Sequence, residues 1–186
     1  MVQCKNLTKK YGSKVALRDA TLHIYPGNIY ALLGPNGSGK TTFMKILGDL
    51  TKQSSGEVLF EGKPLSIQSR KDIAYLPTES QAYPFMTVED YGKYHKSFFP
   101  DFQEEEYKRM LEEMDISLKL PFKALSTGMD KKARIAATLA RNAKLVLLDE
   151  PFNGVDLLAR EEIEKMILEK KRENSTILLS SHLVEE

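Results

Sequence analysis

The feature that most constrains this chain is the stretch at residues 34–42, which reads Gly-Pro-Asn-Gly-Ser-Gly-Lys-Thr-Thr. It fits the pattern G-x-x-x-x-G-K-[S/T] in full. An apolar run at residues 29–33 precedes it, and residues 40–50 carry apolar side chains at helical spacing. This order predicts a strand, a loop and a helix, whose backbone N–H groups converge on a phosphate without obstruction by side chains.

Lys40 is expected to reach the β- and γ-phosphates of a nucleotide, and the hydroxyl of Thr41 to coordinate Mg²⁺. The alternative is a glycine-rich turn that contains a lysine by chance, and the flanking strand and helix argue against it. The predicted phosphate site therefore consists of Gly34, Pro35, Asn36, Gly37, Ser38, Gly39, Lys40, Thr41 and Thr42.

An acidic pair follows the second strongly apolar run. Residues 145–148 (LVLL) have the length of a buried strand and lead directly into Asp149 and Glu150. Ligands of α/β proteins bind at the carboxyl ends of such strands. Asp149 is expected to hold Mg²⁺, usually through water, and Glu150 to polarise a water molecule. Acidic residues at strand ends can also serve solubility, but the phosphate loop favours the catalytic interpretation.

Strands alternate with helices along most of the chain, which predicts an α/β fold with a largely parallel sheet. The first 33 residues are expected to be mostly strands. Further strands are predicted at residues 57–60, 73–76 and 176–180, and helices at residues 132–141 and, exposed to solvent, 160–171.

The stretch between residues 83 and 125 differs in amino-acid composition from the rest of the chain. Aromatic residues and methionine are frequent in it, and Tyr107, Met110, Leu111 and Met114 recur at helical spacing. This pattern predicts a mainly helical insertion. Its aromatic residues are expected to pack in the core rather than to form a ligand surface.

Composition excludes several other classes of protein. The 186 residues suggest one domain, and 27 basic against 26 acidic residues leave a net charge of +1, too little for a nucleic-acid partner. The single cysteine, Cys4, excludes a disulfide framework. The chain shows no apolar run long enough to span a membrane. We therefore expect a globular protein of a reducing compartment.

Seven segments, which follow one another along the chain in the family's order, resemble those of the nucleotide-binding subunit of the ATP-binding cassette (ABC) transporter family. Residues 34–42 match the family's phosphate-binding motif, and residues 145–150 match its acidic, metal-binding motif. The remaining matches are weaker singly. They are Tyr11 with Val15, Tyr75-Leu76-Pro77-Thr78, the signature segment Leu125-Ser126-Thr127-Gly128-Met129, the loop from Pro151 to Asp156, and Ser180-Ser181-His182.

The resemblance implies a P-loop NTPase core with a mainly parallel sheet, an N-terminal antiparallel β part and a helical insertion subdomain. Residues 1–186 then form a single ABC-type domain, with its core at about 1–82 and 130–186 and its helical subdomain at about 83–129. Members of the family continue beyond the point that corresponds to residue 186, so we expect the C-terminal end of the usual domain to be missing.

The resemblance also implies the roles of individual residues. Tyr11 stacks on adenine with Val15 beside it, Glu150 is the general base, and His182 contacts the γ-phosphate. Thr41 and Asp149 hold Mg²⁺, and Thr78 is a further candidate ligand. Ser126, Thr127, Gly128 and Met129 contact the ATP of a partner copy, and Asp156 lies in a loop at the dimer interface.

The function implied is an ATP-hydrolysing subunit that powers transport through a separate transmembrane subunit, on the cytoplasmic face of a membrane. Its cofactors are ATP and Mg²⁺, and its partner is a second copy or a related cassette. Alternatives are a soluble ABC ATPase without a transport role and a regulatory nucleotide-binding module with little catalysis.

Some features depart from the family pattern or have plainer explanations. Thr78 stands where the family has glutamine, and Glu79 or Gln81 is near enough to replace it. The signature reads LSTGM instead of LSGGQ. Ser126 or Thr127 could also simply cap the following helix. Tyr11 alone could be a surface tyrosine, and His182 alone a structural histidine, as we expect for His23 and His95.

Overall fold

The structure, a computed structural model, describes residues 1–80, 82–169 and 175–182. Within these ranges the strands form two sheets. The antiparallel sheet has the order β2-β1-β4-β5 and the parallel sheet the order β3-β8-β7-β6. The strands are β1 (Val2–Tyr11), β2 (Lys14–Ile24), β3 (Ile29–Leu33), β4 (Ser55–Phe60), β5 (Lys63–Pro64), β6 (Ile73–Leu76), β7 (Leu145–Leu148) and β8 (Thr176–Ser181).

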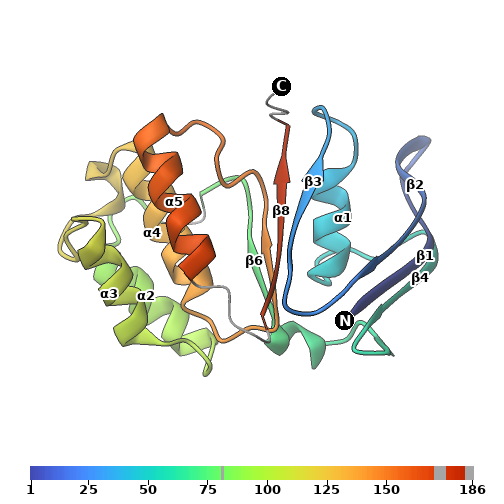
Figure 1. The fold of residues 1–186 in the computed structure, drawn as a ribbon, viewed down its shortest axis with the longest axis horizontal. Coiled ribbons are helices and arrows are strands. Elements are labelled where there is room, and N and C mark those ends of the chain that lie inside the picture. The colour runs from blue at the N-terminus through green and yellow to red at the C-terminus, as the bar shows by residue number, and fades with distance from the viewer. Residues whose placement is uncertain (81, 170–174, 183–186) are drawn as a thin grey trace.

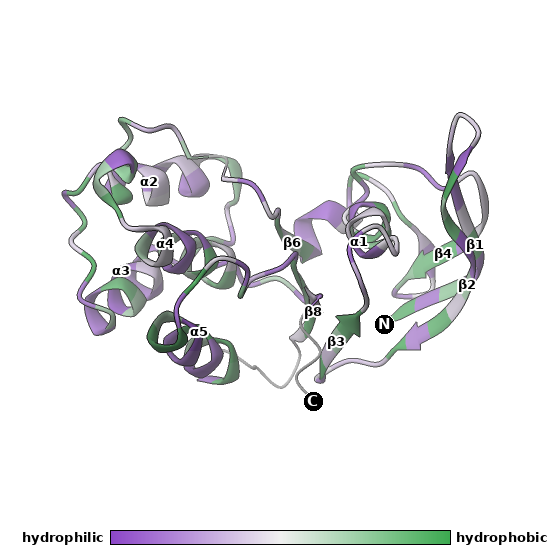
Figure 2. Ribbon diagram, turned by 90° about the horizontal axis from the view of Figure 1, so that it is seen from above, coloured by the Kyte–Doolittle hydropathy of each residue, from purple (hydrophilic) through white to green (hydrophobic). Residues whose placement is uncertain are grey.

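Helices cover both faces of the parallel sheet (Figure 1). Helix α1 (Lys40–Leu47) lies between the two sheets, and the remaining α-helices lie on the opposite side of the parallel sheet, as the view from above in Figure 2 also shows. These are α2 (Val88–Phe98), α3 (Glu104–Glu113), α4 (Thr127–Leu139) and α5 (Leu157–Glu169), with 3₁₀ turns η1 (Ser69–Asp72) and η2 (Phe122–Ala124).

The central strand β7 divides the hydrophobic core in two. Because successive side chains of a strand point to opposite faces, Leu145 and Leu147 join the cluster around α1 and the antiparallel sheet. Val146 and Leu148 join the cluster that includes residues of α2, α3, α4 and α5. All four are buried. A strand buried on both faces is rigidly placed, and so is the residue that follows it.

The predicted fold class is confirmed, and the strands at residues 73–76 and 145–148 have the predicted bounds. The helix predicted at residues 40–50 is too long: it ends at Leu47, with Gly48 as its C-cap. Asp49 then adopts a positive φ of 54°, which turns the chain away. Leu50 therefore leaves the helical face and is 58% exposed.

Two further helices begin earlier than predicted. The helix expected at residues 132–141 starts at Thr127, because the Ser126 hydroxyl accepts a hydrogen bond from the Met129 N–H and caps it. The helix expected at residues 160–171 starts at Leu157, and it is not simply exposed. One side of it buries Ala159, Ile163, Met166 and Ile167, and its predicted end at Lys171 lies outside the described residues.

The aromatic residues of the insertion divide into two groups. Tyr91, Phe102 and Tyr107 are buried, as predicted, and the Tyr107 hydroxyl donates to the Val88 carbonyl at 3.0 Å. The prediction of core packing is wrong for a second group, whose members are exposed to solvent on α2 or in the segment before it. These exposed residues are Tyr83, Phe85, Tyr94 and Phe98.

Candidate active site

The loop at residues 34–39 connects β3 to α1 in a conformation that depends on glycine. Gly37 and Gly39 have φ of 82° and 98°, a region that other residues rarely adopt. A Cβ on Gly39 would lie 2.4 Å from the Ala16 carbonyl oxygen of β2. The Gly34 N–H donates to the Ser181 carbonyl at 3.2 Å, which ties the loop to the end of β8. The strand, loop and helix predicted from the sequence are therefore present.

Lys40 begins α1 and folds back over this loop. Its Nζ donates to the carbonyl oxygens of Gly34 at 2.6 Å and Pro35 at 3.2 Å. The same Nζ lies 3.3 Å from Glu150 Oε1, so the two residues form a buried ion pair. The predicted phosphate-binding lysine and the predicted base thus meet directly.

Asp149 is completely buried at the end of β7 and accepts hydrogen bonds from three elements. Thr41 Oγ1 donates to its Oδ1 at 3.2 Å, and Ser180 Oγ donates to the same oxygen at 2.8 Å. The Tyr75 hydroxyl of β6 donates to Oδ2 at 3.2 Å. Burial, then the Asp149 charge, raises the pKa of Tyr75, so this hydroxyl keeps its proton and acts as a donor.

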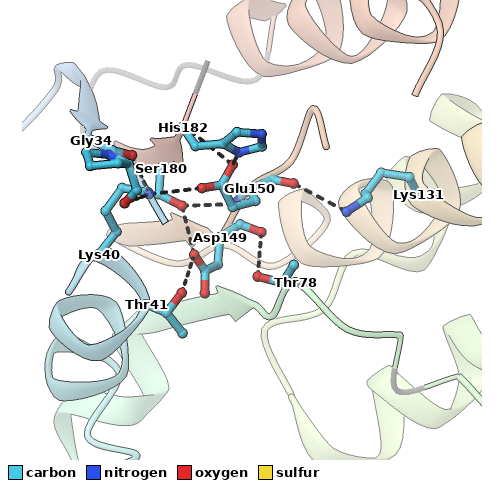
Figure 3. A network of polar contacts seen from close by, with 10 residues as sticks. Gly34, Lys40, Thr41, Thr78, Lys131, Asp149, Glu150, Ser180 and His182 are labelled. Carbon is cyan, nitrogen blue, oxygen red and sulfur yellow. Dashed lines mark hydrogen bonds and ion pairs between the residues drawn. The ribbon is translucent and has the colours of Figure 1, made fainter. Parts of the chain in front are cut away.

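Glu150 points its carboxylate toward the phosphate loop and His182 (Figure 3). Its Oε2 lies 2.8 Å from His182 Nδ1 and accepts a hydrogen bond from the His182 N–H at 3.3 Å. Burial would raise the pKa of Glu150. The hydrogen bonds and charges of His182 and Lys40 outweigh this effect, so the pKa lies below its ordinary value of 4.5.

The segment after β6 also reaches the site. Thr78 Oγ1 donates to the Asp149 carbonyl at 3.5 Å. Glu79 is exposed, and Gln81 lies outside the described residues. Arg134 of α4 holds this segment through the carbonyls of Pro77 at 3.5 Å and Glu79 at 3.3 Å.

These groups surround a pocket of about 350 Å³. It brings Tyr11 to the same cavity as Lys40, Thr78, Glu150 and His182, although these residues come from distant parts of the chain. Val15 pairs with Lys10 in the antiparallel sheet instead of lining the pocket. The described lining is Tyr11, Lys14, Ala16, Asn36, Gly37, Gly39, Lys40, Thr41, Thr42, Thr78, Glu150, Asn153 and His182.

The signature residues stand apart from this pocket. Within the described part of the chain, its lining includes none of Ser126, Thr127, Gly128 and Met129. Ser126 caps α4, as one of the two interpretations of the sequence expected. Asp156 has a similar position at α5, where its carboxylate accepts a hydrogen bond from the Ala159 N–H at 2.8 Å. Both segments therefore open helices that lead away from turns near the surface.

Sequence reasoning assigned no role to several contributors to the site, although some of them stand in the matched segments. Tyr75 and Ser180 bind Asp149, and Lys14 and Asn153 line the pocket. Lys131 of α4 donates to the Glu150 carbonyl at 3.3 Å. The alternation of β6 and β8 could have placed the first two on a face shared with β7. No local sequence pattern indicates the roles of Lys14, Asn153 and Lys131.

Comparison with known proteins decides the family. The family model described as ABC transporter matches residues 17–153. The chain is 35% identical over 188 residues to the lantibiotic transport ATP-binding protein SrtF of Streptococcus pyogenes, covering 100% of this chain and 82% of that protein.

This chain belongs to the ABC transporter family. A solved ATP-binding subunit of an ABC transporter superposes with a TM-score of 0.83 at 27% identity, over 98% of this chain and 80% of that one. The ATP-binding cassette MJ0796 was solved as a dimer in a post-hydrolysis state with ADP and Pi. It superposes with a TM-score of 0.83 at 25% identity, over 98% of this chain and 88% of that one. The predicted ATP-hydrolysing transporter subunit is thereby confirmed as a class, whereas the roles of single residues remain predictions.

The oxygen donors of this ABC subunit fit a magnesium ion. Mg²⁺ takes one or two protein oxygens and fills its remaining positions with phosphate and water. The Thr41 hydroxyl and the Asp149 carboxylate lie 3.2 Å apart, and Thr41 lines the pocket. The described residues hold no cluster of three or more His, Cys, Asp or Glu side chains suited to a metal, so a site made by protein groups alone is not found there.

The lowered pKa of Glu150 predicts a contribution to stability that depends on pH. The carboxylate binds its proton less readily in the folded state, so ionisation stabilises the fold above the ordinary pKa of 4.5. This contribution is lost as the pH falls through the lower, folded value. We expect the difference in free energy of unfolding between wild type and Glu150→Gln, measured by urea titration, to shift against wild type as the pH falls from 7 toward 4. A difference that is constant over this range contradicts the ion-pair geometry.

Proposed function

We propose that this ABC subunit binds Mg-ATP in the pocket between the phosphate loop and Glu150 and hydrolyses it to power a transporter. The observation that carries this proposal is the meeting of Glu150 with His182 at 2.8 Å and with Lys40 at 3.3 Å beside the loop. No described helix is both long and apolar enough to cross a membrane. Because relatives of this chain are ATP-binding proteins of transport systems, we assign the substrate pathway to a separate membrane subunit, with this chain on its cytoplasmic face.

Phosphate binding replaces contacts that Lys40 makes within the protein. Its Nζ contacts the carbonyls of Gly34 and Pro35 and the carboxylate of Glu150. A phosphate offers stronger charge-assisted hydrogen bonds than neutral carbonyls do. Tyr11 lines the same pocket and is 49% exposed, which leaves its ring accessible to a base. These observations support ATP as the ligand, with Asn36, Gly37 and Gly39 around its phosphates.

Glu150 is proposed as the general base. Its lowered pKa keeps the carboxylate ionised near neutral pH, as a base requires. It takes a proton from the attacking water while the oxygen forms a bond to the γ-phosphorus and the bond to ADP breaks. His182 orients the carboxylate through Oε2 and lies where it can contact the γ-phosphate. Mg²⁺, held by Thr41 and Asp149, would neutralise phosphate charge when bound.

A dimer is supported by two independent observations. The residues Ser126–Met129 and Asp156 lie at turns outside the pocket of their own chain. The related cassette MJ0796 was solved as a dimer with ADP and Pi. We infer that two copies, or this chain and a related cassette, meet head to tail, so that the signature turn of each closes over the ATP of the other.

A groove of about 370 Å³ between β6, α2 and α4 is the proposed docking site for the membrane subunit. Tyr94 and Phe98 line it and are exposed, and Tyr83 and Phe85 are exposed in the segment that leads to α2. Exposed apolar groups of this kind mark interaction sites. Pro77, which precedes Thr78, also lines the groove. Docking there would therefore affect the nucleotide site.

Lys40→Ala is expected to weaken Mg-ATP binding about tenfold or more, because charge-assisted hydrogen bonds contribute roughly 1.5–3 kcal/mol each. Isothermal titration calorimetry measures the affinity. Lys45→Ala on the exposed side of α1 is the matched control and should bind like wild type. Unchanged affinity of the Lys40 variant would remove the loop as the phosphate site.

Glu150→Gln keeps the size and hydrogen bonding of the side chain and removes the base. Turnover, measured as phosphate release, should fall by roughly 10²–10⁴-fold while ATP stays bound. Glu164→Gln, which breaks a surface ion pair with Arg160 on α5, is the control and should turn over normally. Wild-type turnover in Glu150→Gln assigns the base to another group. A wild-type chain that binds ATP and releases no phosphate would favour a regulatory module.

Thr78→Gln is expected to raise the basal turnover of the isolated subunit. The threonine hydroxyl reaches the Asp149 carbonyl but is too short to extend over the phosphates, and misplacement of reacting groups by about 1 Å can cost on the order of 10²-fold in rate. ATP affinity should change little, because the phosphate contacts come from the loop. Thr78→Ser, which keeps the hydroxyl, is the control. Equal rates for wild type and Thr78→Gln would mean that Glu79 or Gln81 already fills the role.

A further inference from the structure

Lys131 is a buried lysine that the proposed mechanism does not use. It lies in the second turn of α4 and is 4% exposed. Its Nζ donates to the main-chain carbonyl of Glu150 at 3.3 Å (Figure 3). Lysine is almost never fully buried without a partner, because desolvation of the ammonium group costs free energy. Burial, followed by the charge of Arg134, lowers the pKa of Lys131. Because burial of this ammonium group is costly, we expect its contact with Glu150 to serve a function.

The residue it contacts has an unfavourable backbone conformation. Glu150 has a φ of 52°, in the left-handed region that residues with a Cβ rarely adopt. Such conformations persist where the surroundings hold them, and they concentrate at functional sites. The Glu150 N–H donates to Ser180 Oγ at 2.9 Å, and its carbonyl accepts from the Asn153 N–H at 3.2 Å as well as from Lys131. Hydrogen bonds thus hold both the N–H and the carbonyl of Glu150 in place.

The main-chain conformation decides where the carboxylate points. Rotation about φ of Glu150 would swing its side chain away from His182 and Lys40, which it contacts at 2.8 and 3.3 Å. Lys131 approaches from α4, whose first turn is capped by Ser126. A single helical turn therefore joins the signature segment to the peptide that carries the base. This helix is rigid on the scale of one turn, so its placement is transmitted to Glu150.

We propose that Lys131 is a positioning residue, which holds the main chain of Glu150 in its left-handed conformation and thereby aims the carboxylate at the attacking water. The inference rests on the proposed role of Glu150 as the base. It predicts that loss of the Lys131 amine impairs the chemical step and leaves ATP binding intact, because Lys131 lies outside the described lining of the nucleotide pocket.

The next residue provides a matched control. Lys132 lies on the same helix and is also buried, with 8% exposure. Its Nζ pairs with Glu162 Oε2 of α5 at 2.7 Å, away from the pocket. Lys131→Met and Lys132→Met remove the same charge from neighbouring positions of one helix, and methionine preserves the length, apolar stem and helix propensity.

Steady-state phosphate release over a range of Mg-ATP concentrations tests the proposal. Lys131→Met should lower kcat by about tenfold or more, with KM and the calorimetric ATP affinity close to those of wild type. Lys132→Met should keep kcat near that of wild type. Lys131→Arg, which restores a charged donor, should recover most of the lost rate. Equal kcat for Lys131→Met and wild type, or equal losses in both methionine variants, overturns the proposal.

A double-mutant cycle with Glu150→Gln separates positioning from general damage. If Lys131 acts through Glu150, Lys131→Met should lower the residual rate of Glu150→Gln little or not at all. A loss as large as in the wild-type background overturns the inference. Wild-type turnover in Glu150→Gln alone would instead remove the proposed base. Urea titration checks that each variant is folded, and Lys131→Gln, shorter and uncharged, takes the place of Lys131→Met in both tests if the latter does not fold.

Discussion

The pairing of β7 with β8 in parallel register is the constraint on which the rest of the site depends. Leu148 lies opposite Leu179, so the residues that follow each strand emerge side by side. Ser180 can therefore donate to Asp149 and accept from the Glu150 N–H with one hydroxyl, at 2.8 and 2.9 Å. Two residues further on, His182 meets Glu150. A slip of one residue would turn these side chains to the opposite face.

The charges at this edge of the sheet are arranged as a chain of paired groups. Lys40 contacts Glu150, and Glu150 contacts His182, while hydroxyl groups of Thr41, Ser180 and Tyr75 surround Asp149. Buried charges are tolerated where such partners compensate for lost solvation. The pocket thus holds its acidic and basic groups ready beside the phosphate loop. In the proposed function, the phosphates of a nucleotide replace the contacts that Lys40 makes within the protein.

Helix α4 connects the parts of the subunit that ATP and its partners are proposed to contact. Its cap, Ser126, belongs to the signature segment, and Arg134 holds the carbonyls of Pro77 and Glu79. Ser80 donates to Asp130 at 3.3 Å, and Lys131 reaches Glu150. The helix packs against the core shared with α2, α3 and α5. A displacement of α4 would therefore affect both the segment around Thr78 and the peptide of the base.

The sequence by itself determined those parts of the site whose members are neighbours along the chain. The glycines, Lys40 and Thr41 lie within one strand–loop–helix unit, and Asp149 and Glu150 directly follow a strand whose four residues are all apolar, so local spacing was sufficient. The role of Ser180, Tyr75 and Lys131 was decided by the tertiary structure alone. Strand alternation could place Ser180 and Tyr75 on one face of the sheet, but no local pattern shows which group they contact, and a lysine in a helix is an ordinary residue. Only strand register and the packing of α4 bring their hydrogen-bonding groups to the two acidic residues, because those contacts join segments from 19 to 74 residues apart.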